Sequence, residues 1–142
     1  MAKDLHNLIQ IHEWDVDEKR RKLGELLRLL DNLEAQARAL EDELVREQQI
    51  AKEKPEEGGF LYGEYAENVI DRRERIQESI NQMEAAIAEA REELRLAYVD
   101  LKKYEVAQEN RDRRAAVERG RRDQAETDAV GLEGFRRNRL AG

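Results

Sequence analysis

Side chains that could perform covalent or acid–base chemistry are scarce in this sequence. It contains one serine, Ser79, one threonine, Thr127, two histidines, His6 and His12, and no cysteine. Nucleophilic catalysis needs a nucleophile and a base within hydrogen-bonding reach, and this inventory offers hardly any such pair. On a helix, His6 and His12 would point to different sides, unlike the i, i+4 pair that holds zinc. We therefore predict no catalytic residues, no metal site, no cofactor and no enzymatic activity.

Charged side chains dominate the composition. They make up 42% of the 142 residues, yet the net charge is only −7 because both signs are interleaved. Pairs such as Glu34 with Arg38 and Asp71 with Arg75 have the i, i+4 spacing that stabilises an exposed helix surface, so we interpret most carboxylates as a solvated face. A mean hydropathy of −0.95 excludes a thick globular core. A narrow apolar contact is expected instead.

Apolar residues in the first third of the chain follow a heptad pattern. Alternating steps of four and three connect Leu5, Ile9, His12, Val16, Lys19, Leu23, Leu26, Leu30, Leu33, Ala37, Leu40, Leu44, Glu47 and Ala51. Only His12, Lys19 and Glu47 interrupt this series, which we call the seam. Such a series is typical of a coiled-coil helix, and it predicts a helix over residues 4–54.

A turn and a second helix are predicted to follow. Pro55 cannot donate a helical hydrogen bond, and Gly58 and Gly59 permit reversal, so the turn is placed at 55–61. The seam then resumes through Tyr62, Ala66, Val69, Arg73, Ile76, Ile80, Met83, Ile87, Ala90, Leu94, Ala97, Leu101 and Tyr104. This series predicts a helix over 62–130. We expect residues 131–142 to form a frayed tail because Gly131 and Gly134 each weaken a helix by about 1 kcal/mol.

Folding the two series together gives the predicted architecture. Residues whose numbers add to about 116 become neighbours, which sets His12 near Tyr104 and lets Glu47 pair with Arg73. Beyond Tyr104 the seam fades, so the second helix should extend past the first from Arg111 onward. The fold class is therefore all-α: an antiparallel two-helix coiled-coil hairpin with a C-terminal helical overhang, forming one elongated domain over residues 1–142.

Several apolar residues lie outside the seam and are candidates for partner contact. On the outer surfaces of the two helices these are Ile11, Trp14, Leu96, Val99 and Val106. They fit either scattered surface hydrophobics or a docking surface anchored by Trp14, since tryptophan is enriched at interface hot spots. A second group, near the turn, comprises Phe60, Leu61, Tyr62 and Tyr65. It could cap the end of the seam or contact a partner.

The C-terminal segment is rich in arginine. From Arg111 onward there are nine arginines and six acidic residues. Guanidinium groups favour bidentate contact with carboxylate or phosphate. The interspersed acids would repel a nucleic-acid backbone, so we expect an acidic protein surface and no nucleic acid.

Three segments of the sequence stand out: Leu-Ile-Gln-Ile-His-Glu-Trp-Asp-Val-Asp-Glu-Lys-Arg-Arg at 8–21, Leu-Lys-Lys-Tyr-Glu at 101–105 and Arg-Arg-Asp-Gln-Ala-Glu-Thr-Asp-Ala at 121–129. With the predicted hairpin, they resemble the FliJ family, small cytoplasmic components of the bacterial flagellar type III export apparatus. The resemblance implies a stalk that links the export ATPase ring to the export gate and to escorting chaperones. The candidate contacts with the ATPase are then Arg113, Arg114, Arg121 and Arg122, and the turn would be a candidate for contact with the gate.

Further expectations concern location and assembly. No apolar run is long enough for a membrane span or a signal peptide, so we expect a cytoplasmic protein. The resemblance further implies a position peripheral to the membrane-bound gate, at the cytoplasmic face of the inner membrane, and we expect a monomer. Two alternatives remain open. One is a stalk of the same shape in the injectisome of a virulence type III system, and the other is a structural coiled-coil spacer or homodimeric scaffold.

Overall fold

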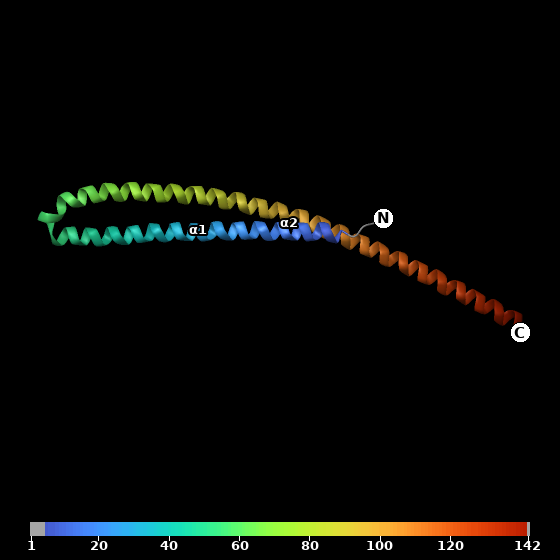
Figure 1. Ribbon diagram of the computed structural model, residues 1–142. Coiled ribbons are helices and arrows are strands. Elements are labelled where there is room, and N and C mark those ends of the chain that lie inside the picture. Colours follow the sequence, from blue (N-terminus) through green and yellow to red (C-terminus); the bar gives the residue numbers. More distant parts are fainter. Residues whose placement is uncertain (1–4, 142) are drawn as a thin grey trace. The chain divides into compact units, whose positions relative to one another are not determined.

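Two long helices form the protein. The computed structural model describes residues 5–141 and the side chains of all of these except 55–62. Helix α1 spans His6–Glu53 and helix α2 spans Pro55–Ala141 (Figure 1). The described residues contain no β-strand. The predicted fold class, an all-α helical hairpin, is confirmed.

The connection between the helices is shorter than the predicted turn over 55–61. Lys54 is the single residue between them, and α2 begins at Pro55. Proline is well tolerated in the first turn of a helix, where its missing N–H would have no intrahelical partner. Pro55 therefore marks the start of α2 and not a loop. The turn candidates Phe60, Leu61 and Tyr62 have side chains outside the described residues.

The far end of α2 also differs from the expectation. The sequence predicted a helix end near Val130 and a frayed tail over 131–142, whereas α2 continues to Ala141. Gly131 and Gly134 lower helix propensity by about 1 kcal/mol each, but no proline follows them and their neighbours are mostly good helix formers. Glycine alone does not end this helix.

Residues 14–98 form one compact unit. Within it α1 and α2 lie side by side (Figure 1) and antiparallel, with Lys22 paired to Glu93 and Glu43 paired to Arg72. The numbers in each pair add to 115, close to the predicted register. Among the side chains described in this unit, the buried ones are all apolar seam residues: Val16, Leu40, Val69, Ile80, Ile87, Ala90 and Ala97.

Seam positions whose side chains the structure describes are buried or half-buried in this unit, with one exception. Lys19 and Glu47, the polar residues of the α1 seam, are half-buried. Arg73 is exposed, and its guanidinium lies 2.7 Å from the carboxylate of Glu41. The predicted pairing of Arg73 with Glu47 was therefore wrong. Because an arginine is long enough to leave the seam, it pairs at the surface, where its charge stays hydrated.

The second compact unit comprises residues 1–13 together with 99–142. Leu101 is buried there, and the backbone N–H of Leu5 donates a 2.9 Å hydrogen bond to Oε1 of Gln108. This bond links the first described residue to α2. Every described residue from Arg111 to Ala141 is exposed, and we call this segment the arm. Neither α1 nor the described part of α2 contains a stretch apolar and long enough to cross a membrane.

Candidate protein-binding surfaces

The apolar residues predicted on the outer helix surfaces are all exposed. In the unit of residues 14–98, Trp14 is 68% exposed and Leu96 is 50% exposed. Ile11, Val99 and Val106 are exposed in the other unit. A large aromatic side chain that is exposed to water offers apolar surface that a partner could bury. Their exposure agrees with the sequence interpretation, and their role in docking stays a prediction.

Tyr98 and Arg20 form a contact between the two helices of the 14–98 unit. A nitrogen of Arg20 donates a 3.2 Å hydrogen bond to the Tyr98 hydroxyl, and the guanidinium carbon lies 5.5 Å from the centre of the Tyr98 ring. Arginine over an aromatic face is held by a cation–π interaction as well. Arg20 is therefore engaged within the hairpin and is a weaker candidate for partner contact than the arginines of the arm.

Tyr65 is the one member of the turn group whose side chain is described. It is half-buried, and its hydroxyl oxygen is shielded from solvent. Burial raises the pKa of the Tyr65 phenol above its ordinary value, and the nearby carboxylates of Glu43 and Glu47 add to this effect. Tyr65 thus packs its polar end inside the hairpin. Contact with a partner through Phe60, Leu61 and Tyr62 stays a prediction.

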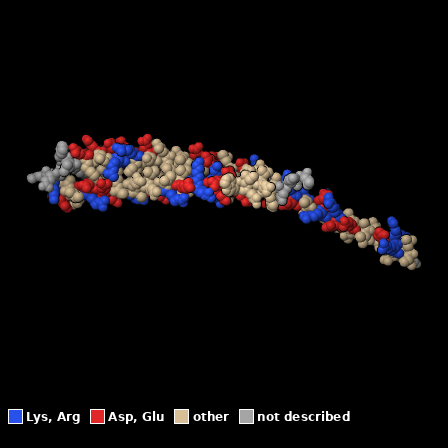
Figure 2. All heavy atoms as spheres, in the orientation of Figure 1, with Lys and Arg blue, Asp and Glu red and all other residues tan. Residues whose placement is uncertain are grey.

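The four arginines predicted to contact an ATPase all lie on the arm and are exposed. Arg114 and Arg121 are seven residues apart, so they share one side of α2, while Arg113 and Arg122 flank that side. Arg122 has a long ion pair with Glu118, at 3.7 Å. Acidic and basic side chains alternate along the visible face of the arm (Figure 2). The arrangement suits an acidic protein surface better than a uniform phosphate backbone.

Sequence reasoning missed a set of apolar residues on the arm. Val130, Leu132, Phe135 and Leu140 are 65–82% exposed. Val130 was the last residue of the predicted helix, and the other three lay in the predicted frayed tail because Gly131 and Gly134 lie among them. A helical arm that displays leucine and phenylalanine to solvent has the composition of a docking segment. The heptad continuation through Leu132 was the signal that could have identified it.

Chemistry other than binding has little support in the described residues. They contain no group of three or more histidine, aspartate or glutamate side chains placed to hold a metal ion. Ser79 is half-buried on α2, and both histidines lie in the other unit, so no histidine accompanies it within its own unit.

The fold places the chain in a class of protein: an all-α helical hairpin with exposed apolar and arginine-rich surfaces. The sequence profile described as "Flagellar FliJ protein" matches residues 1–140. The chain belongs to the FliJ family. Neither a search of curated proteins nor a search of solved structures gave a match. Family membership supports a role connected with flagellar protein export.

Proposed function

We propose that this chain is a coiled-coil stalk that links the export ATPase ring to the export gate and to escorting chaperones. The arm carries the proposal. It is a continuous helix in which every described residue from Arg111 to Ala141 is exposed. An isolated helix of this length is marginal in water, so a partner that covers it would add stability as well as affinity.

Charge and apolar surface support an acidic partner for the arm. Its arginines are long, always charged and able to form bidentate bonds with carboxylates. Its exposed leucines and phenylalanine supply apolar area to bury at the centre of an interface. In this proposal Arg113, Arg114, Arg121 and Arg122 contact the ATPase, and the arm's apolar residues seat the helix between its subunits.

Other surfaces are assigned to the remaining partners. We infer that Trp14 and Leu96, with Ile11, Val99 and Val106, contact escorting chaperones, and that the end near Tyr65 faces the export gate. The protein then works as a monomer in the cytoplasm, at the cytoplasmic face of the inner membrane. The match to a family named for the flagellum favours a flagellar system over an injectisome.

The arm can be tested by binding to the purified export ATPase of the same organism. We expect full-length protein to bind the assembled ring, and we expect Arg113, Arg114, Arg121 and Arg122 changed together to glutamate to weaken binding at least about tenfold, which is about 1.4 kcal/mol. Arg28, Arg38, Arg46 and Arg91 changed together to glutamate form the matched control, since all four are exposed but lie outside the arm.

Two results would contradict the proposal. One is absence of binding by the unmodified protein, and the other is equal weakening by the arm variant and the control. Light scattering distinguishes the proposed monomeric stalk from a homodimeric scaffold, because a homodimer would have twice the monomer mass of 16.6 kDa.

A further inference from the structure

On one flank of the 14–98 unit, the residues next to the seam carry no charge between two ion pairs. The residues that border the seam on this flank are Lys22, Leu29, Gln36 and Glu43 of α1, and Arg72, Ser79, Ala86 and Glu93 of α2. Ion pairs close both ends, Lys22 with Glu93 at 3.2 Å and Arg72 with Glu43 at 3.5 Å. Between them the register sets Leu29 opposite Ala86 and Gln36 opposite Ser79. We call the space between these two ion pairs the neutral groove.

The other flank of the same unit has a different character. Its residues next to the seam are Leu27, Glu34 and Glu41 of α1 and Arg91, Glu84 and Gln77 of α2, so each facing pair holds at least one charge. Arg73 also turns to this flank, where it pairs with Glu41. Flanking positions in a two-stranded coiled coil usually carry charges that hold water and select the partner strand. The neutral groove departs from this pattern, whereas the other flank follows it.

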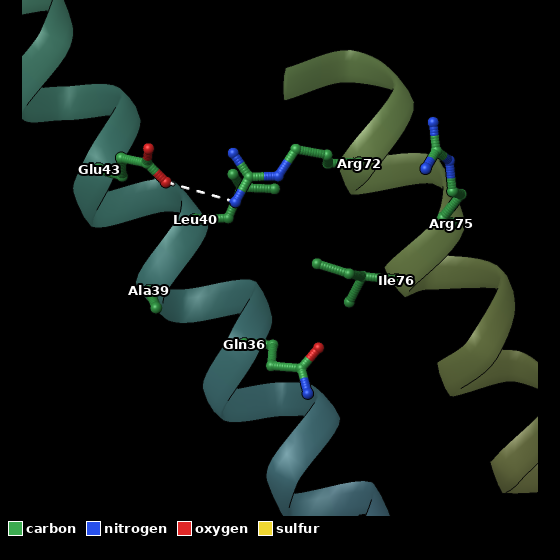
Figure 3. A pocket seen from close by; sticks show the side chains of 7 residues that line it. All are labelled: Gln36, Ala39, Leu40, Glu43, Arg72, Arg75 and Ile76. Atoms are coloured by element: carbon green, nitrogen blue, oxygen red, sulfur yellow. Dashed lines mark hydrogen bonds and ion pairs between the residues drawn. The ribbon is translucent and has the colours of Figure 1, made fainter. Parts of the chain in front are cut away.

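The floor of the neutral groove is apolar and partly open. At one end lies a hollow of about 390 Å³, lined by Gln36, Ala39, Leu40, Glu43, Arg72, Arg75 and Ile76. In Figure 3, Ile76 points across toward α1, and Arg72 reaches over Leu40 to Glu43. Leu33 and Met83, the next seam residues along the floor, are only half-buried. Leu29 adds a wall side chain that is 48% exposed.

The charge along the rim of the groove changes from basic at one end to acidic at the other. Arg75 is exposed at the end with the hollow. It forms no ion pair among the described residues, so the pair with Asp71 that the i, i+4 spacing predicted is absent there. By heptad position, the same rim carries neutral Asn32 and Gln82 in the middle and acidic Glu25 and Glu89 at the far end. A partner with an acidic group near Arg75 and a basic group near Glu25 and Glu89 would complement both ends.

We propose that the neutral groove binds one amphipathic helix of a partner protein, forming a local three-helix bundle with the acidic end of the partner helix at Arg75. The 22 residues from Lys22 to Glu43 extend about 31 Å, at a rise of 1.5 Å for each step along the helix, which leaves room for about five turns of a partner helix. Apolar side chains at heptad spacing on that helix fit the rows formed by Leu29, Leu33 and Leu40 and by Ile76 and Met83. This interaction does not depend on the arm.

A second copy of this chain is a poor occupant for the groove. The exposed helix that each copy could offer is the arm, and residues 111–142 carry nine arginines against six acids. Arginines facing Arg72 and Arg75 would repel. The same argument favours a partner helix that begins with acidic residues, as helices commonly do at their N-terminus.

A designed peptide tests the groove directly. The probe is a synthetic helix of about 18 residues, or about 27 Å, with leucine at heptad a and d positions, two glutamates in its first turn, two lysines in its last turn and a fluorescent label. Fluorescence anisotropy with the full-length protein should give saturable one-to-one binding. Gln36→Glu should weaken binding by about fivefold, because it sets a charge against the apolar face and the acidic end of the peptide.

Matched controls separate the groove from a general effect of charge. Gln48→Glu lies on the same helix, at an exposed glutamine of the opposite flank, and should change the affinity less than twofold. Arg75→Glu should weaken the original peptide by about fivefold and strengthen a peptide whose end charges are exchanged, as expected for a rim charge pair. Circular dichroism confirms that each variant keeps its helix content.

Three results would overturn the proposal: no saturable binding, equal effects of Gln36→Glu and Gln48→Glu, or an affinity that ignores the exchange of peptide charges. Self-association of the protein that competes with the peptide and is abolished by Gln36→Glu would instead assign the groove to a second copy, and would also overturn it. None of these results bears on the ATPase contact of the arm, so failure here leaves the proposed function standing.

Discussion

The rings of His12 and Tyr104 stack across the hairpin, with their centroids 4.6 Å apart and their planes inclined by 22°. Both occupy seam positions, and both are half-buried. Histidine is a poor apolar residue, but its flat ring matches the tyrosine face and keeps its nitrogens near the edge of the contact. The polar interruption of the seam is thereby accommodated, as the register predicted.

Removing the tyrosine ring should destabilise the hairpin. We expect Tyr104→Ala to lower the free energy of unfolding by about 2 kcal/mol, through loss of a large half-buried ring. A double-mutant cycle with His12→Ala should give a coupling of about 0.5–1 kcal/mol, measured by urea unfolding followed by circular dichroism. The same cycle with Tyr98→Ala serves as the control, and additive effects in the His12 cycle would contradict the stacking contact.

Arg73 occupies a seam position, where most of the other residues are apolar. Arg73→Leu should raise the free energy of unfolding by about 1 kcal/mol, because the leucine can fill the seam, whereas the lost ion pair with Glu41 is exposed and worth less than that. Glu41→Gln isolates the ion pair and should change stability by less than about 0.5 kcal/mol. A destabilised Arg73→Leu would mean that the arginine is required in the seam.

Much of this fold could be predicted from the sequence, because a coiled coil is specified by local spacing. The heptad series that includes Leu23 and Leu94 fixed the helices, and the short connection fixed the register. The bounds were less accurate: Pro55 supports either a turn or a helix start, and only the surrounding chain decides between them. The groove could not be found from periodicity alone, since it depends on which flanking residues of α1 face those of α2.

The arm should contribute little to the stability of the free protein. A chain ending at Asn110 should unfold with a free energy within about 0.5 kcal/mol of the full chain, because none of the deleted residues that the structure describes is buried. A chain ending at Tyr98 is the control and should lose several kcal/mol, since it lacks Leu101 and Tyr104. Thermal and urea unfolding followed at 222 nm provide the measurement. A large loss in the first truncation would show that the arm packs on the hairpin.

Tyr65 predicts how stability responds to alkali. Its pKa is raised in the folded protein above the ordinary 10.0 by burial and by Glu43 and Glu47. The folded state therefore holds the phenolic proton more tightly, so this contribution is present below pH 10.0 and is lost as the pH rises through the folded pKa. We expect Tyr65→Phe to reduce the alkaline loss of stability, measured by urea unfolding at several alkaline pH values. Identical pH profiles for Tyr65→Phe and the unmodified protein would contradict this assignment.

The intramolecular hairpin, in which one chain folds back on itself, can be tested directly by distance measurements. Because the sequence has no cysteine, spin labels can be placed on Lys22→Cys and Glu93→Cys alone, and distances measured by electron resonance with an excess of unlabelled protein. An intramolecular hairpin should give a narrow distribution of distances between the two labels. That distance is set by the adjacent helices, about 8–10 Å between axes plus the reach of two labels, and should not change on dilution with unlabelled chains. A long separation, or a short one that disappears on dilution, would contradict the intramolecular hairpin and the stalk built on it.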